Sequence, residues 1–177
     1  MQQSLPDMMV GVVRVILLRG SPERVHYSRR RFIVTLLLAV AAAGAVQAFY
    51  YLDHVVFIIL RIFAELTMFM LGMVVLTAWV ARFRLAYVML LLVLISLGHD
   101  LVLLALAVVG QVTATLPWPA WAGWPVHLAA LYGASNVLSW GLRTGLVRGG
   151  LVALGIVVLS LGIELAFRWL YDLAAAG

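Results

Sequence analysis

Polar and ionisable side chains interrupt the long apolar segments of this 177-residue chain, and they are the groups that could carry chemistry: Arg61, Glu65, His99, Asp100, Asn136, Glu164 and Arg168. A charged side chain surrounded by lipid is costly, so each of these needs a partner or a role. A spacing of four residues along a helix puts Arg61 beside Glu65, where the two charges can pair. The same spacing recurs in Glu164 and Arg168.

The depth of these groups predicts that they share one level. Counted from the proposed outer ends of their segments, Glu65, Asp100 and Asn136 lie about 11 residues deep, which is roughly 17 Å along a helix. Glu164 lies about eight residues deep, or roughly 12 Å. We therefore expect four helices to bring these polar groups together in the outer half of a membrane.

The charges of this polar cluster do not balance. Two arginines contribute +2 and the three carboxylates contribute −3, which leaves −1. A protonated carboxyl, a charged His99, a bound cation or a partner subunit could supply the difference. The cluster fits a proton path, an ion path or a small-ligand site, and it equally fits buried pairs that only fix how the helices pack.

Motifs for other chemistry are missing from the sequence. There is no P-loop, GxGxxG, HExxH or nucleophile-elbow string, and no cysteine. The histidines His26, His54, His99 and His127 lie in different segments, so no single helix offers a metal-binding pair. We expect His99 to be hydrogen-bonded rather than a metal ligand. The sequence therefore predicts a non-enzymatic protein without a metal or a cofactor.

The composition shows which solvent surrounds the chain. Hydrophobic residues make up 66% of it and charged residues only 11%, with a mean hydropathy of +1.12. Soluble domains are roughly 25% charged. The sequence therefore predicts an all-α, polytopic transmembrane helix bundle.

Five apolar segments follow a leading region of 31 residues. We expect about five membrane spans, with bounds near 32–52, 55–80, 86–110, 126–142 and 150–170. The fourth segment is shorter and less apolar than the others. Residues 1–31 form a cytoplasmic lead, in which apolar residues at helical spacing from Leu5 to Leu17 predict an amphipathic helix on the membrane surface.

The arginines predict the orientation of the spans. With five spans, ten arginines fall on one side of the membrane: Arg14, Arg19, Arg24, Arg29, Arg30, Arg31, Arg82, Arg84, Arg143 and Arg148. By the positive-inside rule this side is the cytoplasm of a bacterial cell, with the N-terminus inside and the C-terminus outside. This placement explains the net charge of +5 without nucleic acid as a partner.

The region around Arg29 also resembles a twin-arginine export signal. Ser28 to Ile33 reads SRRRFI, and Val46-Gln47-Ala48 after the apolar stretch resembles a cleavage site. The leading region would then contain a structured helix of its own, which export signals lack. We therefore expect this segment to remain as the first span.

Two further motifs concern packing and the membrane surface. Trp118, Trp121 and Trp124 lie in the loop opposite the arginines, where they predict an interfacial anchor or a binding platform. The overlapping GxxxG steps at Gly141, Gly145 and Gly149 fit a tight turn as well as a dimer contact. Small residues at Ala41, Ala45 and Ala48 predict a helix-packing face on the first span.

The layout resembles the Yip family of small five-span membrane proteins. The matching features are the amphipathic lead from Leu5 to Leu18, the break at 19–22 (RGSP), the basic run before Phe32, and five closely spaced spans. The eukaryotic members work in vesicle traffic and bind small GTPases, which is what the resemblance implies, and the short lead leaves little room for a GTPase-binding domain. No functional residue follows from it.

These observations lead to two expectations of function. The first is a scaffold or accessory subunit of a membrane assembly, with the lipid bilayer and a membrane-protein partner or a second copy as its contacts. The second is a small transporter or proton- or ion-conducting protein that uses the polar cluster.

Overall fold

The computed structural model describes residue 10 and residues 28–50, 55–80, 82–112 and 123–176. These residues form five helices, α2 (Arg29–Tyr50), α3 (Val55–Trp79), α4 (Arg82–Val112), α5 (Trp124–Leu142) and α6 (Leu146–Ala176), and no strand. The all-α prediction is confirmed over this part of the chain. The predicted amphipathic helix, with Arg14 and Arg19, lies outside the described residues.

The helix ends have local causes. The backbone N–H of Arg31 donates to Ser28 Oγ at 3.2 Å, so Ser28 caps the start of α2. Pro125 stands in the first turn of α5, where its missing N–H is harmless. At the other end of α5, Arg143 adopts the left-handed conformation (φ 54°) and the N–H of Thr144 donates to the Ser139 carbonyl at 2.9 Å. This turn reverses the chain into α6.

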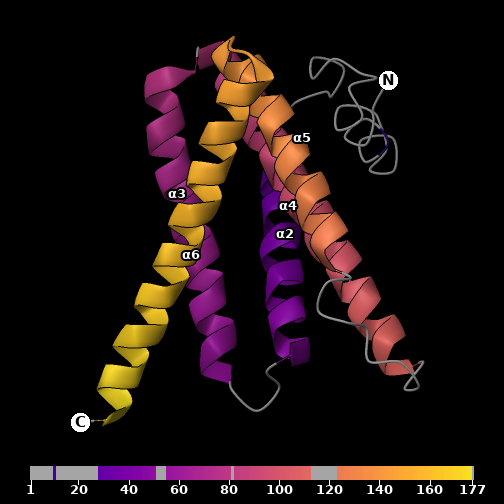
Figure 1. The fold of residues 1–177 in the computed structure, drawn as a ribbon, viewed down its shortest axis with the longest axis vertical. Helices are drawn as coiled ribbons and strands as arrows, with labels where there is room; N and C mark the ends of the chain where they lie inside the picture. Colours follow the sequence, from indigo (N-terminus) through magenta and orange to yellow (C-terminus); the bar gives the residue numbers. More distant parts are fainter. Residues whose placement is uncertain (1–9, 11–27, 51–54, 81, 113–122, 177) are drawn as a thin grey trace.

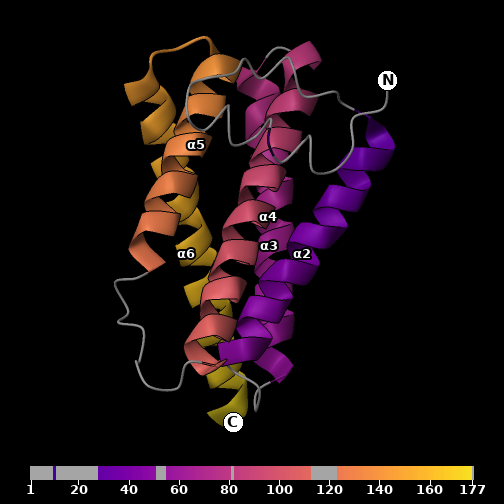
Figure 2. The ribbon, with the colours of Figure 1, turned by 90° about the vertical axis from the view of Figure 1, so that its right-hand side faces the viewer.

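The helices pack in two layers. One layer holds α2, α4 and α5, with α4 in the middle, and the other holds α3 and α6 (Figure 2). The contacts between the layers are those of α2 with α3 and of α5 with α6, and a smaller one joins α3 to α4. Helices α5 and α6 meet at the turn that joins them and diverge away from it (Figure 1), whereas α2 and α3 come together nearer the opposite end, where Gly44 faces Ile62.

Arginines gather at one end of the molecule. The start of α2, the α3–α4 junction and the α5–α6 turn all lie at this end, and the C-terminus lies at the other (Figure 1). We call it the arginine end. It carries Arg29, Arg30 and Arg31 on α2, Arg82 and Arg84 on α4, and Arg143 and Arg148 at the turn.

The largest hydrophobic core lies towards the arginine end of the molecule. It joins the first half of α4 to the second half of α5, and its fully buried side chains are Val88, Leu90, Leu91, Leu94, Val137 and Leu138. A second cluster packs Ala39 and Ala42 of α2 against Val93 and Leu97 of α4. The predicted packing face of α2 is wrong in register, because Ala41 and Ala45 are exposed.

The glycine run at 141–149 forms a tight turn, one of its two predicted roles. Gly141 lies so close to α4 that an added Cβ would stand 2.5 Å from Val88 Cγ2. At Gly149 an added Cβ would stand 2.4 Å from the Ser135 carbonyl oxygen of α5, whereas Gly145 in the turn has nothing within 4 Å. The two outer glycines thus allow close helix packing within one chain.

Two of the described helices are long and apolar enough to cross a membrane. They contain the stretches Arg84–Gly110 of α4 and Leu146–Leu173 of α6. The hydrocarbon core of a bilayer is about 30 Å thick, and each stretch exceeds it at about 1.5 Å per residue.

Candidate functional site

A chain of hydrogen bonds joins three ionisable side chains from two helices. On α4, Nδ1 of His99 lies 2.8 Å from Oδ1 of Asp100. Nε2 of the same ring lies 2.7 Å from Nδ1 of His127 on α5. Both nitrogens of His99 are therefore engaged, and this residue links a carboxylate to a second imidazole.

The helical face of each residue explains this arrangement. Asp100 follows Val93 and Leu97 at intervals of seven and three residues, which puts it on the face of α4 that packs against α2. The next face of α4 meets the start of α5, where an added Cβ on Gly123 would contact Leu103. His99 lies four residues before Leu103 on this second face and next to Asp100 in the sequence, so it connects the two faces.

Burial decreases steadily along this series of hydrogen-bonded side chains, from Asp100 to His127. The side chain of Asp100 is 5% exposed, that of His99 is 19% exposed, and His127 is exposed. Nε2 of His127 lies beside Gly123, where even an added Cβ would stay 3.5 Å away. The three groups therefore connect the buried α2–α4 interface to the outside of the protein.

The second oxygen of Asp100 stands out chemically. Oδ2 is buried and has no hydrogen-bond partner among the residues that the structure describes. A buried polar atom without a partner costs about 1–3 kcal/mol, and an isolated buried charge costs more. A proton delivered to Asp100 would remove the charge and part of this cost.

Hydrogen-bond roles follow from a carboxylate at one end. Ionised Asp100 can only accept, so Nδ1–H of His99 donates to it. Nε2 of His99 then accepts from Nδ1–H of His127, which leaves a lone pair on the outer Nε2 of His127. The chain has a proton acceptor at its exposed end and a carboxylate at its buried end.

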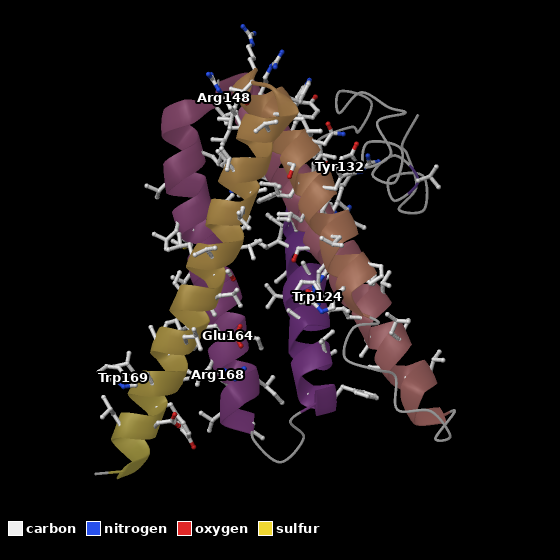
Figure 3. All side chains as sticks on the ribbon, in the orientation of Figure 1. Trp124, Tyr132, Arg148, Glu164, Arg168 and Trp169 are labelled. Carbon is white, nitrogen blue, oxygen red and sulfur yellow. The ribbon has the colours of Figure 1, made fainter. Side chains whose placement is uncertain are left out.

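An aromatic ring flanks the exposed end. The ring of Trp124 meets His127 edge-on, with centroids 6.2 Å apart, and Trp124 itself is largely exposed (Figure 3). Trp124 is one of the three tryptophans predicted as interfacial anchors. Trp118 and Trp121 lie outside the described residues.

The predicted pair on the last helix forms as expected. Nη2 of Arg168 donates to Oε1 of Glu164 at 2.7 Å, and both residues lie on the stretch of α6 beside α3 (Figure 3). The histidine chain lies at a different interface, between α4 and α5. Arg61 and Glu65 belong to α3, and their side chains lie outside the description.

The depth prediction fails for Asn136. Contacts run antiparallel along α4 and α5, from His99 opposite His127 to Val88 opposite Gly141. Asn136 is nine residues from His127 and five from Gly141, so its level is nearer Val88 than Asp100. The prediction assumed that all spans begin at one level, whereas α5 begins partway along α4, beside Leu103.

One predicted topology arginine has a specific contact at the arginine end. Nη1 of Arg84 donates to the Trp140 carbonyl at 2.8 Å, and the guanidinium lies 4.8 Å from the centre of the Trp140 ring. It therefore satisfies a carbonyl in the last turn of α5 and adds a cation–π contact. Arg29, Arg30, Arg143 and Arg148 are exposed.

His127 was not predicted as part of the site. The four histidines lie in different segments, and the spacing of residues within one helix cannot indicate a pair that joins two helices. The available signal was that His99 and His127 occupy consecutive apolar segments, which pack as antiparallel neighbours when the loop is short. No group of three or more His, Asp, Glu or Cys side chains suited to a metal occurs among the residues described.

Comparison with known proteins gives no relative. No protein-family model matches the chain, and no curated protein or solved structure matches it. The fold and the site define an all-helical protein with two helices able to cross a membrane and a histidine–aspartate chain between α4 and α5.

Proposed function

We propose that this protein is a non-enzymatic, multi-pass membrane protein that takes up and conducts protons through Asp100, His99 and His127. The single observation that carries the proposal is the unbroken pair of hydrogen bonds, 2.8 Å and 2.7 Å long, between the buried carboxylate and the exposed imidazole. Intramembrane Asp and His side chains in such chains are typical of proton relays.

The proton transfers balance along this chain. A proton binds the Nε2 lone pair of His127, and the Nδ1–H proton of that ring moves to Nε2 of His99. The Nδ1–H proton of His99 then moves to Oδ1 of Asp100. One N–H bond breaks and one N–H or O–H bond forms at each transfer, so a single added proton ends as a neutral carboxyl in the buried interface.

The membrane topology of the proposal is the five-span bundle. The chain lies in the bacterial inner membrane with its N-terminus in the cytoplasm and its C-terminus outside. Support comes from the arginine end, where the start of α2, the start of α4 and the α5–α6 turn lie together (Figure 1). The length of α5, 19 residues or about 28 Å, is close to the hydrocarbon thickness.

Proton flux into liposomes tests the proposed function. Purified protein is reconstituted with a pH-sensitive dye inside, and a potassium gradient with valinomycin drives protons inward. We expect flux from the wild type, and its loss in Asp100→Asn and in His127→Phe. Asp172→Asn is the matched control, because Asp172 is exposed near the end of α6.

Two outcomes would overturn this proposal. One is wild-type flux no higher than that of empty liposomes. The other is unchanged flux in folded Asp100→Asn and His127→Phe proteins, with folding checked by circular dichroism and by a single elution peak.

A second candidate function is an accessory subunit or scaffold of a membrane assembly. The observation in its favour is α6, where Gly149 and Ala153 are the buried residues among 146–173. Its exposed apolar side chains include Val147, Leu151, Val158 and Leu165. Either lipid or a partner subunit must cover so much apolar surface.

Co-purification in mild detergent tests this second function. A partner or a second copy that stays bound to the wild type and is lost in Leu151→Asn plus Leu165→Asn would support it. A strictly monomeric protein without partners would contradict it. The likeness to the Yip family, which rests on layout alone, belongs with this candidate.

A further inference from the structure

We propose that the hydrogen bond between His99 and His127 is an acid-sensitive latch, which holds the first half of α5 against α4 at neutral pH and releases it when both rings are protonated. The latch regulates the relay proposed above and in that sense rests on it. It concerns the movement of a helix, however, and is measured without any proton flux.

The two halves of α5 differ in how they are held. The second half contains the buried side chains Val137 and Leu138, and Gly141 touches Val88. In the first half, Trp124 and Leu128 are 62% and 60% exposed. The His99–His127 bond is the hydrogen bond that joins this half to α4 among the residues described. The second half is therefore packed into the core, whereas in the first half Ala130 and Leu131 touch the core and the His99–His127 bond lies nearer the start of the helix.

The end of α5 next to the α5–α6 turn is the fixed point about which the first half of α5 can rotate. The guanidinium of Arg84 holds the Trp140 carbonyl, and Gly149 seats α6 against Ser135. These contacts fix the arginine end of α5 to both neighbouring helices. A rotation about this end moves the His127 end of the helix furthest.

The chemistry of the latch depends on one shared proton. Two imidazole rings with nitrogens 2.7 Å apart need one donor and one acceptor. When both rings are imidazolium cations, both nitrogens are donors, and the bond becomes a repulsive contact between two positive charges. His127 is exposed, so it is the ring that can move away.

Among the side chains that the structure describes, Asp100 on α4 is the charged group bonded to the pair, through Nδ1 of His99. The neighbouring helices carry these other ionisable groups: Arg29, Arg30 and Arg31 on α2, Arg61 and Glu65 on α3, Arg84 and Tyr87 on α4, Tyr132 on α5, and Arg148, Glu164, Arg168, Tyr171 and Asp172 on α6.

Spin-label distances in the full-length protein test the latch. The chain has no cysteine, so labels go only where cysteines are introduced. Leu38→Cys on α2 pairs with Leu128→Cys on the first half of α5, because α2 and α5 flank α4 (Figure 2). The control pairs Leu38→Cys with Val147→Cys, at the start of α6 beside the fixed end.

The comparison is made at about pH 8 and about pH 5, on either side of the ordinary histidine pKa of about 6.5. In the wild-type background we expect the Leu38–Leu128 distance to lengthen at the lower pH and the control distance to stay constant. In His127→Gln, which bonds to His99 without gaining a charge, we expect no lengthening.

Three results would overturn the latch. They are an unchanged Leu38–Leu128 distance between the two pH values, an equal lengthening in His127→Gln, and an equal change in the control pair. Flux is recorded separately, so a latch that opens in a protein without flux would refute only the relay, and flux without opening would refute only the latch.

Discussion

The two halves of α5 show how one helix can serve both the fold and a site. From about Ala134 to Leu142 the helix is part of the core, where Gly141 lets α4 approach closely and Ser135 lies against Gly149 of α6. From Trp124 to about Leu131 most side chains are exposed, and His127 supplies the hydrogen bond to α4. The same helix thus holds a packing region and a polar region, with His127 about three turns from the buried Leu138.

The difference shows that a polar contact contributes the largest share of the stabilising free energy where few apolar side chains pack. A hydrogen bond contributes about 1 kcal/mol, which is small beside the burial of a leucine core. In the first half of α5, Ala130 and Leu131 pack against that core at the inner end, and the residues before them are mostly exposed. Protonation of both rings can therefore influence the position of the start of this half and leave the other half unchanged.

The strongest test of the packed half is a side chain added at Gly149. A Cβ there would stand 2.4 Å from the Ser135 carbonyl, so Gly149→Leu should prevent α5 and α6 from docking and abolish folded protein. Gly155→Leu on the same helix is the control, since nothing lies within 4 Å of it. Yield of monodisperse protein in detergent is the measurement. Equal yields would show that the close approach is dispensable.

A leucine in each half gives a direct comparison. Leu138 is fully buried and Leu128 is 60% exposed. Leu138→Ala should lower the free energy of unfolding by about 2–5 kcal/mol because it leaves a cavity. Leu128→Ala should change it by less than about 0.5 kcal/mol. Unfolding in mild detergent, followed by circular dichroism, measures both. Similar losses would mean that the halves are packed alike.

Removal of the arginine that holds the end of α5 should have a smaller effect. Arg84→Gln loses the charged hydrogen bond to the Trp140 carbonyl and the contact with the Trp140 ring. The expected loss is about 2 kcal/mol in the free energy of unfolding. Arg30→Gln, at an exposed position of α2, is the control. A loss no larger than that of the control would refute a role for Arg84 at this end.

The smallest expected effect is a gain in stability at the turn. Arg143 has a positive φ of 54°, a conformation that costs a residue with a side chain roughly 1–2 kcal/mol relative to glycine. Arg143→Gly should therefore raise the free energy of unfolding by about 1 kcal/mol. Arg148→Gly, inside α6, should lower it, because glycine weakens a helix interior. A loss in both variants would show that the Arg143 side chain contributes more than the strain.

Much of the fold could be predicted from the sequence. The length of the apolar segments placed five helices close to their observed bounds, and a spacing of four put Glu164 and Arg168 where they pair. These features are local, since they depend on residues within one or two turns. The number of spans remains a prediction, because length and composition qualify α4 and α6 among the described residues.

The histidine chain could not be predicted in the same way. It depends on the offset between α4 and α5, which is set by core packing at Val88 and Gly141 and is not encoded in either helix alone. An error in this offset moved Asn136 to the level of Asp100 and separated His127 from His99. Similarly, the register of Ala39 and Ala42 against Val93 is decided by the partner helix.

The left-handed Arg143 has a consequence for how the protein is made. Glycine would suit this turn better once the protein has folded, and the proposed topology gives the arginine a role at another stage. A membrane protein acquires its orientation while the chain is being inserted, before its helices pack, and positive charges beside a hydrophobic segment set that orientation. In the proposed topology, Arg143 therefore contributes before the folded state forms. Arg143→Gly should therefore give a protein that is more stable once folded. A larger fraction of its chains should be inserted in the opposite membrane orientation.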